Sequence, residues 1–283
     1  MSNPPRYRRV AVLLATLGAL LLTAAPAAAL TTCVFTYPLT GDTMLLTADC
    51  TTDETIYVPD GVTLDGAGYT ITAANPAVGD FNGAVVRNAT TSAEMHVTNL
   101  VIDGALDSDT CDGGDNRLRG ILFDRAGGTV TDTTVRDIRQ GPASGCQEGN
   151  AIEARSFDPA TGEATDPRVT VTISDNVVTG YQKTGIVASG GVDAVITRNV
   201  VTGDGPVDYN AQNGIQVGFG ATALISANTV SGNDYTPTSW FACGIIIVDA
   251  DGVDARPQDN LLFDNEKDLC GYRRGGNYEP FGR

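Results

Sequence analysis

Three stretches in the second half of the chain repeat one pattern: Ile173-Ser-Asp-Asn-Val-Val-Thr-Gly180, Ile196-Thr-Arg-Asn-Val-Val-Thr-Gly203 and Ile225-Ser-Ala-Asn-Thr-Val-Ser-Gly232. Each copy is too short for a helix, is rich in β-branched residues and is closed by glycine, which is typical of a strand that ends in a tight turn. Thr98-Asn-Leu-Val-Ile-Asp-Gly104 is an earlier relative. This recurrence predicts a solenoid, in which neighbouring copies stack on one another.

A second pattern alternates with the first. It begins with Gly-Ile and indicates the start of a strand. Its copies are Thr184-Gly-Ile-Val-Ala-Ser, Asn213-Gly-Ile-Gln-Val-Gly and Cys243-Gly-Ile-Ile-Ile-Val, with Arg119-Gly-Ile-Leu-Phe-Asp and Asn150-Ala-Ile-Glu-Ala-Arg as looser copies. No stretch after the first 29 residues keeps a helical period, so the sequence predicts an all-β chain.

Stacking these units would bring Asn176, Asn199 and Asn228 above one another at a turn. Side-chain amides in successive coils, spaced about 4.8 Å apart, can then hydrogen-bond to each other. We expect this asparagine ladder to be structural.

Together with Ile56-Tyr-Val-Pro-Asp-Gly-Val-Thr-Leu-Asp-Gly-Ala-Gly-Tyr-Thr-Ile71, which looks like a first coil, these repeats resemble the right-handed parallel β-helix superfamily. Its relatives include pectate-lyase-like enzymes and periplasmic copper-binding β-helices. The resemblance covers roughly Thr55 to Asn265 and implies a single-stranded right-handed parallel β-helix of about seven coils. Residues 30–283 would form one domain, with a cap at 30–54 and a polar tail at 271–283.

The resemblance is specific for the fold and does not identify a function, because one fold hosts many sites. The sequence contains neither the paired aspartates and Gly-His-Gly of polygalacturonase-like hydrolases nor the Trp- and His-bearing motifs of typical pectate lyases. No catalytic residue can therefore be carried over from these enzymes.

The N-terminus predicts a secretory signal peptide over residues 1–29. Arg6, Arg8 and Arg9 precede an apolar run of 13 residues and a small-residue segment ending at Ala29. That run is shorter than the roughly 20 residues of a membrane-spanning helix, so we expect a secreted protein with no membrane segment after cleavage. Cleavage removes three positive charges and changes the net charge from −16 to −19. So acidic a chain is not expected to bind nucleic acid.

All six cysteines follow the signal peptide, an even number that favours disulfides in an oxidising compartment. Six cysteines allow many pairings, and we predict nearest-neighbour bonds: Cys33–Cys50, Cys111–Cys146 and Cys243–Cys270. None of the cysteines has the Cys-x-x-Cys spacing of a zinc or redox site.

Five insertions would carry the function, because repeat proteins commonly bind ligands on the side where insertions accumulate. They span residues 105–118, 139–148, 156–168, 204–212 and 233–242, and we expect all of them on one edge of the rod. Aromatic rings among polar groups suit a sugar chain, although each ring could equally pack a loop against the body. The expected substrate-binding residues are Tyr181, Gln182, Tyr209, Gln212, Gln216, Tyr235, Trp240 and Glu148.

Two catalytic hypotheses use this edge. In a polysaccharide lyase, Lys183 would be the base that removes a proton beside a uronate carboxyl group, with Arg139 neutralising the carboxylate. In a glycoside hydrolase, Glu153 and Asp208 would be the carboxyl pair. Lys183 could equally be an exposed solubilising lysine, and a chain with 34 acidic residues easily places two on one edge by chance.

Cofactor chemistry has few candidates in this sequence. Asp107, Asp109, Asp112 and Asp115 are closely spaced carboxylates of the kind that calcium prefers, without the full spacing of an EF-hand; the alternative is a solvated acidic loop. His96 is the sole histidine, which gives little support to a Ser-His-Asp triad or a multi-histidine metal centre.

The sequence therefore predicts a secreted, monomeric β-helix that binds a polysaccharide along its loop-bearing edge and, in the enzyme version, cleaves it. The alternative is a non-catalytic extracellular or cell-envelope scaffold. An ice-binding array would need a flat face of repeated threonines, and these do not stay in place from coil to coil in the sequence.

Overall fold

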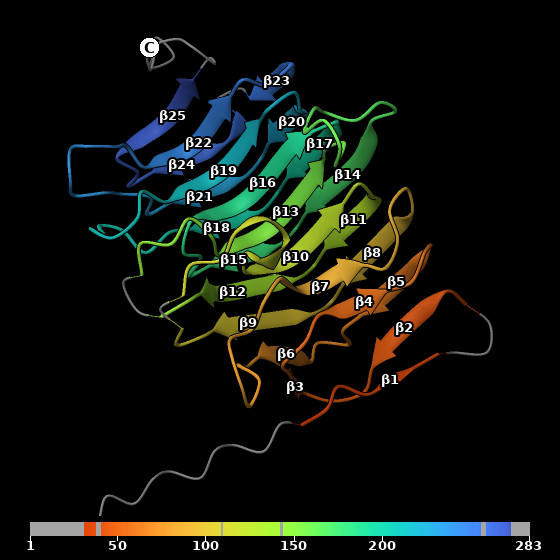
Figure 1. Cartoon of the computed structure of the whole chain (residues 1–283). Coiled ribbons are helices and arrows are strands. Elements are labelled where there is room, and N and C mark those ends of the chain that lie inside the picture. The colour runs from red at the N-terminus through yellow and green to blue at the C-terminus, as the bar shows by residue number, and fades with distance from the viewer. Residues whose placement is uncertain (1–30, 38–40, 109, 142–143, 256–258, 273–283) are drawn as a thin grey trace, which may run out of the picture.

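The computed structural model describes residues 31–37, 41–108, 110–141, 144–255 and 259–272. The predicted signal peptide, Asp109 and most of the predicted polar tail lie outside these residues. The described part of the chain begins with two short strands and winds through three sheets, named A, B and C (Figure 1). This is the predicted all-β parallel β-helix.

Sheet A has nine strands in spatial order: β1 (Phe35–Thr36), β2 (Thr43–Leu46), β5 (Val62–Asp65), β8 (Glu94–Thr98), β11 (Gly127–Thr131), β14 (Val169–Ser174), β17 (Val192–Thr197), β20 (Thr222–Ser226) and β23 (Gly252–Ala255). Sheet B has β3 (Cys50–Thr52), β6 (Thr70–Ala73), β9 (Val101–Ala105), β12 (Thr134–Arg139), β15 (Val177–Thr179), β18 (Val200–Thr202), β21 (Thr229–Ser231) and β24 (Leu261–Phe263). Sheet C has β4 (Ile56–Val58), β7 (Ala84–Asn88), β10 (Arg119–Asp124), β13 (Asn150–Ser156), β16 (Thr184–Gly190), β19 (Asn213–Gly218), β22 (Cys243–Val248) and β25 (Lys267–Tyr272).

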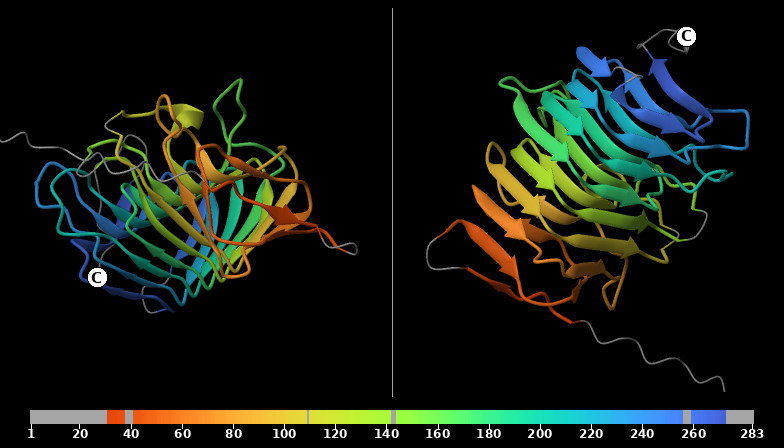
Figure 2. Two further views of the ribbon diagram at one scale, coloured as in Figure 1. Left: turned by 90° about the horizontal axis from the view of Figure 1, so that it is seen from below. Right: turned by 180° about the vertical axis from the view of Figure 1, so that it is seen from behind.

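Each coil visits sheets A, B and C in turn, so each described strand after β1 pairs in parallel with the strand one coil away. The coils stack along a rod whose sides are the three sheets (Figure 2). Because side chains alternate between the two faces of a strand, one set from each sheet points into the rod. Val171, Ile173, Val178 and Ile186 are fully buried members of this apolar core.

The glycine of the Gly-Ile pattern is required by close approach to the core. A Cβ atom added at Gly185 would lie 2.6 Å from Cγ1 of Val201 and 2.7 Å from the carbonyl oxygen of Gly214 in the next coil. Any larger residue would push apart sheets B and C or two successive coils. The Gly-Ile pattern therefore repeats glycine because sheet C packs closely against sheet B and against the next coil at this position.

The predicted asparagine ladder is confirmed at the turn from sheet A to sheet B. Asn176 Nδ2 donates to Asn199 Oδ1 at 2.9 Å, and Asn199 Nδ2 donates to Asn228 Oδ1 at 2.9 Å. The ladder extends one coil further than predicted, because Asn228 Nδ2 donates to Asn260 Oδ1 at 3.0 Å. All four side chains are buried, so they satisfy backbone groups that water cannot reach.

The three predicted disulfides are confirmed: Cys33–Cys50, Cys111–Cys146 and Cys243–Cys270. The first fastens the N-terminal segment, where β1 pairs antiparallel with β2, to the start of β3. The third joins the last two strands of sheet C.

The insertions do not all share one edge. Those at 105–118, 139–148, 204–212 and 233–242 leave sheet B and return at sheet C, as expected. The insertion at 156–168 instead follows β13 of sheet C and precedes β14 of sheet A, so it lies at a different corner of the rod. The prediction for this insertion is wrong, because the strand before it already belongs to sheet C.

Candidate functional site

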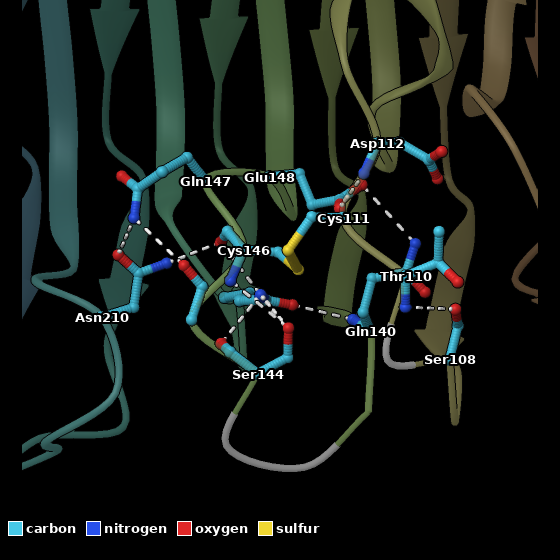
Figure 3. The surroundings of a disulfide bond; sticks show 12 residues. Ser108, Thr110, Cys111, Asp112, Gln140, Ser144, Cys146, Gln147, Glu148 and Asn210 are labelled. Carbon is cyan, nitrogen blue, oxygen red and sulfur yellow. Dashed lines mark hydrogen bonds between the residues drawn. A yellow bond between two sulfur atoms is a disulfide. The ribbon is translucent and has the colours of Figure 1, made fainter.

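The loops between sheets B and C are joined to one another (Figure 3). The Cys111–Cys146 disulfide links the loop before β10 to the loop before β13. Asn210, in the loop before β19, donates from Nδ2 to the carbonyl oxygen of Cys146 at 2.9 Å and accepts a 3.1 Å hydrogen bond from Gln147 Nε2. These three loops therefore form one braced structure, which we call the loop wall.

Three predicted substrate-binding side chains are instead buried braces of the loop wall. Both carboxylate oxygens of Glu148 accept backbone hydrogen bonds, from Asp112 at 2.9 Å and from Leu118 at 2.8 Å. Gln182 donates to the carbonyl oxygens of Ser144 and Cys146, each at 3.0 Å. Gln212 donates to the carbonyl oxygen of Tyr181 at 2.6 Å. All three are at most 2% exposed, so a substrate at the surface does not reach them.

Tyr181 was also expected at the surface and is wholly buried. Its ring belongs to the apolar core, and its hydroxyl donates a 2.6 Å hydrogen bond to Oδ1 of Asn233. Burial raises the pKa of this phenol well above its usual value, so it stays protonated. Tyr181 therefore packs the rod and does not contact a ligand.

Glu153 lies on the outer face of sheet C, in register with Leu122, Val187 and Gln216 as its strand position predicts. The loop containing the short 3-10 helix η1 (Gly114–Asn116) crosses in front of β10 and β13 and covers this part of the face (Figure 1). Glu153 is consequently only 6% exposed, beside the 3%-exposed Arg119.

An ion pair keeps Glu153 charged. Its Oε2 accepts hydrogen bonds from Arg119 Nε at 2.7 Å and from Asn150 Nδ2 at 2.8 Å. Burial alone raises the pKa of Glu153, but the charge of Arg119 and these hydrogen bonds outweigh it and hold the pKa below its usual value. A general acid in a glycosidase needs a raised pKa. Glu153 is therefore not suited to be the general acid of the hydrolase hypothesis, which pairs it with the exposed Asp208.

Lys183 is half-buried beside the loop wall, just before β16. Its Nζ lies 2.8 Å from the carbonyl oxygen of Ala211 and 3.4 Å from Oδ1 of Asn210. None of the ion pairs among the described residues includes it, and burial lowers its pKa to about 8. An amine with this pKa is partly neutral near neutral pH and can accept a proton.

Arg139, the expected partner of Lys183, is engaged elsewhere. Its Nη2 lies 2.7 Å from Oδ2 of Asp204 and 2.9 Å from the carbonyl oxygen of Gly180. This guanidinium has already found a carboxylate of the chain itself, so neutralising a substrate carboxylate would require breaking the Asp204 pair.

The aromatic residues toward the C-terminal end of this edge are accessible. Trp240 is 72% exposed and Phe241 is 42% exposed, in the loop before β22. Tyr235 in the same loop forms a parallel bridge with Val207, so the loops that carry Tyr235 and Tyr209 run side by side. Tyr235, Tyr209 and Gln216 are all half-buried, and they stay candidates for ligand contact.

Of the four carboxylates predicted as calcium ligands, Asp109 lies outside the described residues and two others contact side chains of the protein itself. Asp115 pairs with Arg155 at 2.5 Å, and Asp107 accepts a 2.7 Å hydrogen bond from Asn75. Burial and the nearby charge of Glu148 raise the pKa of Asp112. Across the described residues, no three His, Cys, Asp or Glu side chains are grouped so that they could hold a metal ion.

Threonine is not maintained from coil to coil along sheet A, as expected, although hydroxyl groups do recur in one column. One outward column in register consists of Thr98, Thr131, Ser174, Thr197 and Ser226. The neighbouring column changes from Thr172 to Val195 and Leu224, so the regular hydroxyl face is only one column wide. His96 lies in that second column, between Thr63 and Thr129, and is paired with the Thr129 hydroxyl at 3.0 Å, in keeping with a structural role.

Sequence reasoning missed a cluster of arginines near the corner between sheets C and A. Arg87 pairs with Asp124, and Nε of Arg155 lies 3.4 Å from the same carboxylate. Aligning the two looser Gly-Ile copies would have found part of it, because Asp124 ends one copy and Arg155 ends the other. These two residues are neighbours in register.

Comparison with known proteins agrees with the fold. Residues 164–268 match the family model described as "Right handed beta helix region". No curated protein and no solved structure matches the chain. In the described part of the chain, no helix has the length and apolar character needed to cross a membrane.

Proposed function

This chain is a right-handed parallel β-helix protein, and we propose that it binds a polysaccharide outside the cell. The proposed site lies at the C-terminal end of its loop-bearing edge. The observation that carries the proposal is the exposure of Trp240, the only tryptophan in the sequence, next to the exposed Phe241. Three disulfides suit the oxidising compartment in which a secreted protein would work.

An exposed tryptophan beside an exposed phenylalanine leaves a large apolar surface in water, and such a surface usually marks a binding site. Flat rings can stack on the apolar faces of sugar rings while nearby polar groups bond to the hydroxyls. The Lys267 ammonium lies 5.3 Å from the centre of the Phe241 ring and supplies such a donor. Tyr209, Tyr235 and Gln216 add further hydrogen-bonding groups.

Because Trp240 is the only tryptophan, its fluorescence reports directly on this site. We expect neutral or uronic polysaccharides to shift or quench the emission of the purified protein in a saturable way. Trp240→Ala should weaken binding by about 10-fold or more, measured by affinity electrophoresis, since it removes an aromatic anchor. Tyr57→Ala is the matched control, because Tyr57 is 54% exposed at the opposite end of sheet C.

If no polysaccharide in a broad panel changes the emission, the carbohydrate proposal is rejected and the non-catalytic scaffold becomes the better interpretation. Binding that survives Trp240→Ala but is lost in Tyr57→Ala would place the site at the other end of the rod.

A second candidate function, polysaccharide lyase activity, is favoured by the lowered pKa of Lys183. A neutral amine at this position could take the proton next to a uronate carboxyl group. The test is the absorbance of unsaturated uronides released from polyuronates. Activity should rise with pH toward and through about 8 and be abolished in Lys183→Ala. Unsaturated product formed equally by the Lys183→Ala variant would contradict this role.

A further inference from the structure

The connections from sheet C to sheet A differ in length between neighbouring coils. Residues 89–93 join β7 to β8 and residues 157–168 join β13 to β14, whereas only Arg125 and Ala126 join β10 to β11. The longer loop projects from the rod (Figure 2, green in the left view). A cleft of about 570 Å³ opens over the short turn, between the two longer connections.

A glycine allows neighbouring strands to pack closely beside this cleft. Gly127 lines the cleft just after the short turn, and a Cβ atom there would lie 3.0 Å from the carbonyl oxygen of Thr170. The volume falls within the range of about 300–1,000 Å³ that is typical of small-molecule sites. The cleft is therefore large enough for a ligand the size of a sugar.

Two arginines line the cleft, and they differ in how far their guanidinium groups are engaged by the protein. The Arg168 guanidinium bonds to Asp193 at 2.6 Å and to the carbonyl oxygens of Val192 and Gly220 at 2.7 and 2.9 Å. The Arg125 guanidinium donates no hydrogen bond to any described residue. Its side chain is 32% exposed, and its Nε is 3.8 Å from the Asp124 carboxylate.

Asp124 cannot neutralise Arg125 by itself, because it also serves Arg87 and Arg155. Three guanidinium groups thus surround one carboxylate, and the only other acid paired with them is Asp115, which bonds to Arg155. These three guanidinium groups outnumber the two carboxylates paired with them, while three further acids, Glu94, Asp158 and Asp166, line the same cleft. An anionic group can bind here even though the protein as a whole repels anions.

We propose that this cleft binds a small hydroxylated carboxylic acid, such as a uronic acid, whose carboxylate is held by Arg125. The planar fork of a guanidinium matches a carboxylate with two parallel hydrogen bonds. The hydroxyls of Ser92 and Thr170 and the exposed carboxylate of Glu94 line the same cleft and suit the hydroxyl groups of the ligand. Glu94, Asp158 and Asp166 would repel a phosphate, with its second negative charge, more strongly than a carboxylate.

The test is isothermal titration calorimetry of the purified protein with glucuronate, galacturonate and gluconate, alongside glucose and glucose 1-phosphate. We expect one or more of the acids to bind, glucose to bind at least 10-fold more weakly, and glucose 1-phosphate to bind more weakly than the acids. Trp240 fluorescence should not change, because Trp240 lies in the loop before β22. That silence separates this site from the proposed polysaccharide site.

Two variants target the cleft. Arg125→Asn removes the guanidinium and should abolish binding of the acids; asparagine tolerates the left-handed backbone at this position, where φ is 52°. Thr170→Tyr fills the cleft from an exposed strand position and should abolish binding even if Arg125→Asn folds poorly. Arg136→Gln is the control, on sheet B and paired with Asp103. The proposal is overturned if no acid binds, if glucose or the phosphate binds as well as the acids, or if binding survives Thr170→Tyr.

Discussion

The hydroxyl of Tyr181 donates a 2.6 Å hydrogen bond to Oδ1 of Asn233, a residue two coils further along the rod. Both side chains are fully buried, and Nδ2 of Asn233 continues the chain of hydrogen bonds to Oδ1 of Asn265 at 3.0 Å. The phenol therefore begins a polar chain inside an otherwise apolar core. A buried polar group that loses its hydrogen-bond partner destabilises the folded protein.

Tyr181→Phe should lower the free energy of unfolding by about 1–3 kcal/mol, because Oδ1 of Asn233 loses a buried donor. Binding of polysaccharide, followed by Trp240 fluorescence, should not change. Tyr69→Phe is the control, since Tyr69 is 39% exposed. Urea denaturation of the two variants measures the difference, and equal stability would show that the Tyr181 hydroxyl contributes nothing.

The sequence predicted those features that depend on regular spacing. Asn176, Asn199 and Asn228 could be aligned because each occupies the same place in a repeated strand and turn. The direction of a side chain in an irregular turn depends on how that turn folds, and the repeats say nothing about it. Tyr181 follows a glycine that recurs in the internal repeat, and only the structure shows that its ring enters the core.

The positions of the insertions also could not be predicted from the repeats alone. Their lengths can be read from the sequence, but the corner at which each emerges depends on which sheet supplies the strand before it. The 156–168 insertion was misplaced for this reason, and the cleft that contains Arg125 was missed with it. Pairings such as that of Arg119 with Glu153 also depend on which loop covers the sheet, which no local pattern reveals.

Asn199→Ala should destabilise the protein strongly, by about 2–5 kcal/mol. The variant loses the bonds from Asn199 Nδ2 to Asn228 Oδ1 and to the carbonyl oxygen of Ile173, and it leaves the backbone N–H of Asn176 without its acceptor. Asn82→Ala should cost less than about 0.5 kcal/mol, because Asn82 is exposed. Thermal denaturation compares the two, and similar melting temperatures would contradict a structural role for the ladder.

Glu153→Gln should destabilise the protein by about 3–5 kcal/mol at neutral pH, because it leaves the buried Arg119 charge without its partner. The folded-state pKa of Glu153 is lowered, so its contribution is present above the usual pKa of 4.5 and disappears as the pH falls through the lower folded-state value. The gap between wild type and variant should therefore shrink in acid. Glu163→Gln, at an exposed position, controls for general charge effects in the same denaturation series; a gap independent of pH would contradict the assignment.

Lys183 and Lys267 are the only two lysines of the chain, and they should respond oppositely to replacement by methionine. Burial disfavours the Lys183 ammonium, so Lys183→Met should stabilise the protein at pH 7, by on the order of 2 kcal/mol. Lys267→Met should give no stabilisation, because Lys267 is exposed and loses its contact with Phe241.

The pH dependence gives the sharper test of Lys183. Below about pH 8 Lys183 is protonated in both the folded and the unfolded protein, so burial of its charge destabilises the folded state to the full extent. Between about 8 and the usual value of 10.5 the unfolded chain binds more protons than the folded one, and wild-type stability rises with pH relative to the variant. The advantage of Lys183→Met should therefore fade across this interval in urea denaturation. An advantage that stays constant from pH 7 to 10 would mean that the amine titrates normally, which would also remove the main support for Lys183 as a lyase base.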